Sequence, residues 1–387
     1  MLPHLRTYFR DQGLDPAAFP LRIHAPGRIN IIGEHTDYTD GLVMPASIDK
    51  GIEFCARRLA EPVLRLHAVD LGETYELSLP ITEKTGTLWV DYLAGIAEQF
   101  QQLGHAVPGL EIVFGGDLPR GSGMSSSAAL EGGMAFLLNR VSEASLSRPE
   151  LAQLCKRSSN HFIGIPSGIM DQFASLNGTA AGPIMLHCGS LEFTRIDAEL
   201  PGCQWLLVNS MVSHELTGSE YPERVRQCGE ALAVVRQRFP EVPNLSAVTP
   251  EQLAAVAGAM EEQTAKRARH VVTENDRVRR MATALASGDA TTAGDLLNAS
   301  HASLRDDYEV SCAEVDFLQA CATRELPDVV LGSRIMGGGF GGCTINLVRT
   351  AGLPTLRQRL MEAYFGAWGR RPEFYGVRVS EGVRLLN

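Results

Sequence analysis

The segment at residues 115–131, GGDLPRGSGMSSSAALE, places glycines and serines directly before a helix-forming run. Gly121 and Gly123 permit unusual backbone angles and let a ligand approach the backbone closely. The serines at 125–127 offer hydroxyls and backbone N–H groups at the start of that helix, where the helix dipole attracts anions. The segment therefore predicts a binding site for a nucleotide phosphate. The alternative is an ordinary loop with a serine N-cap, for which one serine would suffice.

This segment differs from the common nucleotide-binding motifs. A Walker A loop needs the pattern G-x-x-x-x-G-K-[ST], and none of the four lysines of the chain follows such a glycine pattern. The H-R-D and D-F-G triplets of protein kinases are also missing from the sequence. If the chain handles ATP, it uses another phosphate-binding design.

A second group of chemically active residues lies at 26–45, in PGRINIIGEHTDYTDGLVMP. Its charged members are Arg28, Glu34, His35, Asp37 and Asp40. Carboxylates beside a histidine could bind a metal ion, or they could accept hydrogen bonds from several hydroxyls of a sugar. The spacing lacks the H-E-x-x-H pattern of a zinc-binding helix. A solvated loop is the alternative.

Two further segments carry candidate residues. Asp171 stands among apolar neighbours in GIPSGIMDQFAS, so we expect it to be partly buried, as a reactive group, a helix N-cap or half of a structural salt bridge. The glycine cluster GGGFGG at 337–342 formally contains G-x-G-x-x-G. A strand-like run follows it where a dinucleotide-binding motif requires a helix, so we reject that interpretation. A tight turn and a close approach to a ligand both stay open.

The elements that must position these segments mix helices and strands. Apolar spacing predicts helices at 5–12, 88–103, 127–141, 222–238, 250–286 and 290–304, strands at 21–27, 52–58, 63–69, 110–114 and 205–209, and a hairpin at 184–195. Pro201-Gly202 is the best candidate for a domain boundary, because a new apolar strand follows it. The elements show no regular βαβα rhythm, which favours an α+β fold.

Composition excludes several classes of protein. The formal net charge of −10 argues against general binding of nucleic acid or anionic membranes. No run of 18 apolar residues occurs, so we expect no membrane span. The eight cysteines form no C-x-x-C pair, which is typical of reduced thiols in a cytoplasmic protein.

Taken together, these segments resemble the galactokinases, in the superfamily that also includes homoserine, mevalonate and phosphomevalonate kinases. The resemblance rests on PGRINIIGEHTDY at 26–38, LPRGSGMSSSAALE at 118–131 and GGGFGGCT at 337–344, in that order. GIMDQFASL, NSMVSHELTGSEYPERVRQC and SLRDDYEVSC lie between them and are also similar to galactokinase sequences. The resemblance therefore spans nearly the whole chain.

The resemblance implies an α+β fold of two domains, 1–200 and 201–387, with the active site in the cleft between them. It implies galactose and ATP as ligands, with Mg²⁺ on Ser127, in a monomer or a weak homo-oligomer. The implied sugar-binding residues are Glu34, His35, Asp37, Gly168 and Tyr221. The implied nucleotide-binding residues are Trp89, Gly121, Ser122, Gly123, Met124, Ser125, Ser126 and Ser127.

The implied reaction transfers the γ-phosphate of ATP to the anomeric hydroxyl of galactose, giving galactose 1-phosphate and ADP. Asp171 would accept the hydroxyl proton, with Arg28 beside it and the phosphates. A neighbouring arginine stabilises the ionised carboxylate and weakens it as a base. The pair could therefore act mainly by orienting the hydroxyl and stabilising charge, and both roles stay open.

The sequence departs from the family at one position and leaves two other functions to consider. Relatives usually carry a glutamate, a second Mg²⁺ ligand, where this chain has Ser159; either water and phosphate oxygens hold the ion or another acid, such as Asp117, substitutes. A kinase for N-acetylgalactosamine is one alternative, although Thr36 replaces the bulkier residue of such enzymes. A non-catalytic sensor of galactose and ATP is the other, although the serine-alanine loop, which is damaged in such relatives, is intact at 125–129.

Overall fold

The computed structural model describes residues 1–119, 121–165, 167–212 and 220–386, apart from the side chains of residues 220 and 221. Its larger sheet has six strands in the order β13–β1–β3–β6–β4–β5. These strands are β1 (Leu21–Asn30), β3 (Pro45–Arg58), β4 (Val63–Ala68), β5 (Glu73–Ser78), β6 (Leu110–Gly116) and β13 (Arg384–Leu385). β4 pairs with β6 in parallel, and the other neighbours in this sheet are antiparallel.

Side-chain alternation along β3 explains how helices cover both faces of this sheet. Phe54 points into the main core, which packs against α2 (Leu88–Gln102), α3 (Ser126–Val141), α4 (Arg148–Arg157) and α5 (Met170–Asn177). The next residue, Cys55, points to the opposite face, as the period of two requires. There it meets Leu5 and Phe9 of α1 (Pro3–Asp11).

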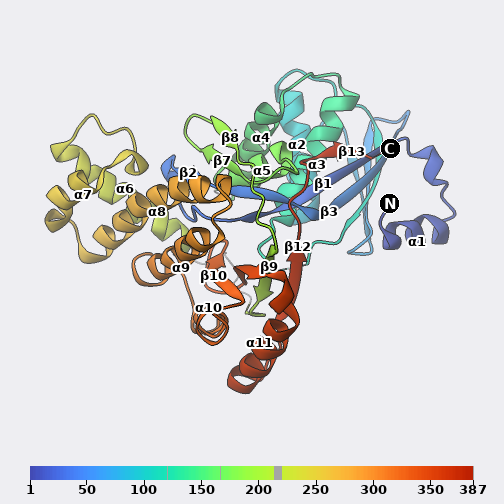
Figure 1. Ribbon diagram of the computed structural model, residues 1–387. Helices are drawn as coiled ribbons and strands as arrows, with labels where there is room; N and C mark the ends of the chain where they lie inside the picture. The colour runs from blue at the N-terminus through green and yellow to red at the C-terminus, as the bar shows by residue number, and fades with distance from the viewer. Residues whose placement is uncertain (120, 166, 213–219, 387) are drawn as a thin grey trace.

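A second sheet of four antiparallel strands, in the order β10–β11–β9–β12, organises the second half of the chain. Its strands are β9 (Cys203–Asn209), β10 (Val330–Met336), β11 (Cys343–Arg349) and β12 (Glu373–Val377). The helices of this half are α6 (Glu220–Arg238), α7 (Pro250–Val256), α8 (Glu262–Ala286), α9 (Ala290–Asp306), α10 (Ala313–Glu325) and α11 (Leu353–Trp368). Figure 1 shows α6 and α7 grouped at one end of the molecule, and α11 as a long helix beside the second sheet.

The two halves share a hydrophobic core. Ile29 of β1 and Ile31 and Ile32 beyond its end pack in one cluster with Leu207 of β9 and Met281 of α8. A small third sheet, β2 (Leu42–Val43), β7 (Ile184–His187) and β8 (Phe193–Arg195), contains the expected hairpin. The segment after residue 26 therefore runs from the first sheet into the contact between the halves.

Most expected elements are present, and one was predicted wrongly. The single helix expected at 250–286 is divided into α7 and α8 by a short 3₁₀ turn, Ala257–Ala259. The backbone of Met260 is extended (φ −98°, ψ 153°), which ends the first helical run. Helices α4, α5, α10 and α11 were not predicted.

The division at residue 200 stays a prediction. β9, the first strand of the second sheet, begins at Cys203, close to that point, whereas β13 returns to the first sheet. Among the helices of the described residues, none is long and apolar enough to cross a membrane.

Candidate active site

A cavity of about 540 Å³ brings the separate sequence motifs together. Its lining includes residues from the charged segment at 26–45, the glycine-serine loop, the Asp171 segment and the glycine cluster, together with Ser159: Arg28, Glu34, His35, Asp37, Gly121, Ser122, Gly123, Met124, Ser125, Ser126, Ser127, Ser159, Gly168, Asp171, Gln172, Gly337 and Gly338. All catalytic and sugar-binding residues expected from the sequence lie here except Tyr221, whose side chain is outside the described part of the chain.

The glycine-serine loop leads into the N-terminus of α3 at one wall of the cavity. Gly121 and Gly123 have positive φ angles of 68° and 70°, the left-handed region that glycine adopts without strain. Ser125 also has a positive φ, and the helix begins at Ser126. The N–H groups of this first helical turn have no partner within the helix and suit an anion, and binding of a nucleotide phosphate there stays a prediction.

Arg28 and Asp171 form a bidentate ion pair in the cavity. Nε of Arg28 donates to Oδ1 of Asp171 and Nη2 donates to Oδ2, both at 2.8 Å. Ser125 Oγ also donates to Oδ2 of Asp171, and Nη1 of Arg28 donates to the Gly123 carbonyl. The pair therefore joins β1, α5 and the glycine-serine loop at one point.

Asp37 faces Gly168 on another side of the cavity. A Cβ atom added to Gly168 would lie 1.6 Å from Oδ2 of Asp37, so only glycine leaves room for this carboxyl group. Burial, with the nearby Asp171 and Glu34 carboxylates, raises the pKa of Asp37 to about 7. The carboxyl group is therefore held close to its point of ionisation at neutral pH.

Glu34 is anchored from the second half of the chain. Arg334 of β10 is fully buried, and its Nη1 donates to Oε2 of Glu34 at 2.7 Å. The same guanidinium donates to the carbonyls of Asn30 and Ile31. Arg334 therefore fixes both the backbone and the side chain of this stretch.

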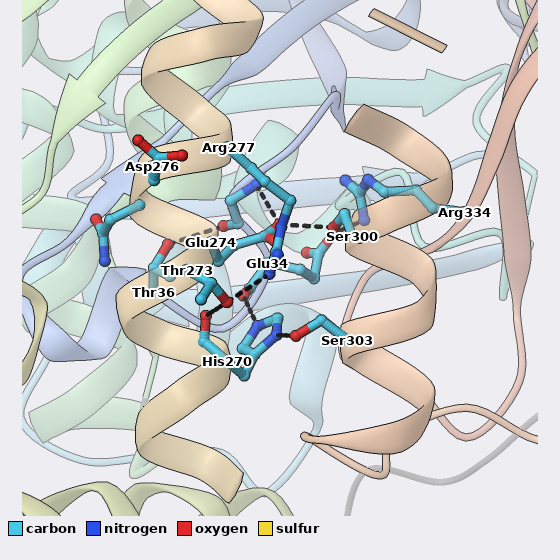
Figure 2. A network of polar contacts seen from close by, with 12 residues as sticks. Glu34, Thr36, His270, Thr273, Glu274, Asp276, Arg277, Ser300, Ser303 and Arg334 are labelled. Carbon is cyan, nitrogen blue, oxygen red and sulfur yellow. Dashed lines mark hydrogen bonds and ion pairs between the residues drawn. The ribbon is translucent and has the colours of Figure 1, made fainter. Parts of the chain in front are cut away.

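Helix α8 holds the backbone of the same stretch, and Figure 2 shows Glu274 of α8 facing Ser300 of α9. Oε1 of Glu274 accepts hydrogen bonds from Gly33 N and from Ser300 Oγ. His270 lies 3.0 Å from the Glu34 carbonyl through Nε2. Thr36 is buried, and its hydroxyl contacts the carbonyls of Gly33 and Leu42, so this side chain shapes the loop instead of facing the cavity.

His35 is neutral in this setting. Burial, followed by the influence of His270 and Arg224, lowers its pKa to about 3. Its Nδ1 lies 3.0 Å from the Tyr38 hydroxyl, and its ring packs 4.9 Å from the Tyr308 ring. A neutral imidazole can serve a sugar hydroxyl as donor or acceptor.

Sequence reasoning missed a buried acid next to the cavity. Glu131 of α3 is fully buried and accepts hydrogen bonds from Ser159 and Gln172. Its position one helical turn after Ser127 could have been read from the sequence as an i, i+4 pair. Asp117, the other acid considered, accepts from Gly51 N and faces Lys50, and it is not part of the cavity lining.

Trp89 and the glycine cluster differ in their relation to the cavity. Trp89 packs 5.8 Å from Phe114, donates to Glu73, and is not part of the cavity lining. Its role near a nucleotide stays a prediction. Gly337 and Gly338 do line the cavity, in a turn between β10 and β11. The turn is therefore present, and the close approach to a ligand stays a prediction.

Metal ligands are sparse around the cavity. Within the described ranges, no group of three or more His, Cys, Asp or Glu side chains is placed to hold a metal ion. Magnesium in nucleotide sites is usually held by one or two protein groups together with water and phosphate oxygens. The hydroxyl of Ser127, at the start of α3 and on the cavity wall, fits that kind of site.

Three family models match the chain. They are the GHMP kinases N terminal domain at residues 91–179, the galactokinase galactose-binding signature at 15–58 and the GHMP kinases C terminal domain at 281–364. These matches cover the glycine-serine loop, the Arg28 segment and strands β10 and β11 of the second sheet. The α+β fold is therefore that of a two-domain GHMP kinase.

Similar proteins agree with these models. A galactokinase of Roseiflexus sp. is 38% identical over 93% of this chain and 92% of its own length. A galactokinase of Thermotoga maritima is 36% identical over 95% and 100%. The structure of Lactococcus lactis galactokinase complexed with galactose matches with a TM-score of 0.93 at 35% identity, over 99% of both chains. Methanococcus jannaschii mevalonate kinase shares the fold at a TM-score of 0.66 and 17% identity, over 93% of this chain and 98% of its own. The chain therefore belongs to the galactokinase family of the GHMP kinases, which are ATP-dependent.

Proposed function

We propose that this protein transfers the γ-phosphate of ATP to the anomeric hydroxyl of galactose, producing galactose 1-phosphate and ADP. The observation that carries the proposal is the Arg28–Asp171 pair, which stands in one cavity with the galactose-binding signature and the glycine-serine loop. A transfer needs the acceptor hydroxyl and the phosphate at the same point. The pair occupies that point, since it touches the loop through Ser125 and Gly123.

Galactose would lie against Glu34, His35, Asp37 and Gly168, with Tyr221 as a further contact. The phosphates of ATP would lie on the loop from Gly121 to Ser127, where N–H groups at the start of α3 meet them. These ligand positions follow from the family resemblance and from the shared cavity.

Asp171 is suited to receive the sugar hydroxyl. An ionised carboxylate offers about four acceptor positions. Three of those on Asp171 are filled, by Arg28 Nε on Oδ1 and by Arg28 Nη2 and Ser125 on Oδ2. Oδ1 therefore keeps one acceptor position. We propose that it accepts the hydroxyl proton, while Arg28 holds the carboxylate in place and faces the phosphates.

Ser127 is the residue that we propose for Mg²⁺, through its hydroxyl. When bound, the ion would neutralise phosphate charge as it develops during transfer. We further propose a cytoplasmic enzyme, monomeric or weakly self-associating, that binds neither nucleic acid nor membranes. The net charge of −10 supports the absence of nucleic-acid and membrane binding, and the free cysteines support the cytoplasmic location.

The test is ADP release from Mg·ATP with galactose, glucose or N-acetylgalactosamine, for the wild type and Asp171→Asn. We expect galactose-dependent ADP release that falls about 10²–10⁴-fold in the variant, with galactose binding retained in calorimetry. Faster turnover of N-acetylgalactosamine than of galactose would favour the amino-sugar kinase. Binding of both ligands with no ADP from any sugar would refute the enzyme and favour the sensor.

A further inference from the structure

Glu131 is a buried carboxyl group that has no cation partner among the described residues. Its two hydrogen-bond donors are both neutral: Ser159 Oγ donates to Oε1 at 2.6 Å, and Gln172 Nε2 donates to Oε2 at 3.1 Å. A buried carboxylate without a cation is costly unless a positive charge reaches it from elsewhere.

The two donors separate Glu131 from the active-site cavity. Ser159 and Gln172 line the cavity, and so does Ser127, which lies one turn before Glu131 on α3. The carboxyl group therefore stands directly behind a wall of neutral oxygen and amide groups. A cation in the cavity next to that wall would be the missing partner.

The amide oxygen of Gln172 is a second feature that points to a ligand. Its side chain is 4% exposed, and its Oε1 has no hydrogen-bond partner among the described residues. Because Nε2 is held by Glu131, the oxygen on the same amide carbon is directed away from that carboxyl group. A buried amide oxygen without a partner is normally satisfied by water or an ion.

Two other carboxylates of the cavity already have arginine partners. Arg28 holds Asp171, and Arg334 holds Glu34. The third carboxyl group, that of Asp37, packs on Gly168. The positive charge of Lys156 acts on it and lowers its pKa. Glu131 is thus the carboxyl group next to the phosphate loop whose charge stays uncompensated in the described structure.

We propose that Glu131, acting through Ser159 and Gln172, is the positioning residue that supplies the negative charge for the Mg²⁺ of the bound nucleotide. The inference rests on the proposed function, in which Mg·ATP occupies this cavity. Ser127, Ser159 and Gln172 all line the cavity, and each carries a neutral oxygen of the kind that a hard, strongly hydrated cation accepts. Glu131 orients the latter two and places a charge behind them, in the way that outer-shell carboxylates support metal ligands.

The test measures binding of Mn²⁺ to the protein saturated with ADP. Binding is detected as a loss of the electron paramagnetic resonance signal of free Mn²⁺. In Glu131→Gln, which keeps the size and one acceptor oxygen, we expect Mn²⁺ affinity to fall about 10-fold or more. ADP affinity without metal should be unchanged. Glu111→Gln is the matched control, because Glu111 is a buried carboxylate of β6 that pairs with Arg57, away from the cavity. It should bind Mn²⁺ as the wild type does.

Ser159→Ala gives an independent measurement if Glu131→Gln does not fold. It removes one donor to Glu131 and one oxygen of the cavity wall, so Mn²⁺ affinity should fall as well. Wild-type affinity for Mn²⁺ in either folded variant, whatever its thermal stability, would overturn the proposal and leave Glu131 a structural residue. If the wild type itself binds no Mn²⁺ with ADP, the proposed function fails instead, so the two failures are distinguishable.

Discussion

Replacing Gly168 by alanine tests whether Asp37 binds the sugar without altering Asp37 itself. The new Cβ would lie 1.6 Å from Oδ2 and 2.3 Å from Cγ of Asp37, whereas ordinary contact begins near 3.4 Å. The carboxyl oxygen must therefore move by about 1.8 Å. A hydrogen bond from this oxygen to the sugar would not survive such a displacement. Gly168 does not have a positive φ, so the effect comes from the side-chain clash.

The structure gives the size of the effect. A hydrogen bond to a charged group contributes about 1.5–3 kcal/mol, and about 1.4 kcal/mol corresponds to a tenfold change in affinity. We therefore expect the KM for galactose to rise about 10- to 100-fold in Gly168→Ala. The KM for ATP should change less than about threefold, because the phosphate loop lies at another wall of the cavity.

The assay is steady-state ADP release with galactose and ATP varied in turn. Gly366→Ala is the matched control, since an added Cβ at this position of α11 meets nothing within 4 Å. It should leave both KM values unchanged. A Gly168→Ala variant that folds normally and keeps the wild-type KM for galactose would refute the contact between Asp37 and the sugar.

Three further perturbations test the site and its support. Because burial raises the pKa of Asp37 to about 7, the KM for galactose should rise as pH falls through 7, and Asp37→Asn should remove this dependence; a parallel profile in both proteins would contradict the assignment. Arg334→Met leaves the buried Glu34 carboxylate unpaired, so we expect the free energy of unfolding in urea to fall by about 3–5 kcal/mol; a loss below 1 kcal/mol would show that the pair contributes little. Burial alone would raise the pKa of Glu274, but Arg277 and His270 lower it to about 2. Its stabilisation is then fully present above the unfolded pKa near 4.5 and is lost as pH falls towards 2. Urea midpoints of the wild type and Glu274→Gln should therefore converge over that interval, and a constant difference would count against the ion pair.

Local patterns were enough to predict the glycine-serine loop and most strands. The signal for the loop is contiguous: glycines that permit positive φ, serines, and then a helix-forming run. Strands such as β4, whose residues alternate between buried and half-buried, show a pattern that an isolated segment already reveals. The break between α7 and α8 was missed because a long helix tolerates an isolated glycine such as Gly258, and because Met260 is itself a good helix former.

The support of the site depends on pairs that are far apart in the sequence. Arg28 and Asp171 are 143 residues apart, and Arg334 and Glu34 are 300 apart. The spacing of Glu131 from Ser127 is a local signal, but its partner Ser159 comes 28 residues later, so the sequence does not show that the two side chains meet behind the cavity. Family resemblance identified most of the polar residues that line the cavity, although not Gln172, and it also named Trp89, which lies outside the lining. The pairing of the buried charges behind the cavity became visible only from the fold.

The return of β13 to the first sheet has a consequence for synthesis on the ribosome. Ile23 and His24 of β1 pair with Leu385 and Arg384, and Val383 is fully buried in the core of the first sheet. About 360 residues separate these partners along the chain. At 5–20 residues per second, translation needs roughly 20–70 s to cover that interval. During this time the nascent chain carries β1 as an open edge, the kind of strand to which other chains add. Until β13 has been made and has folded back, the first sheet therefore ends in an edge strand that is open to pairing with other chains.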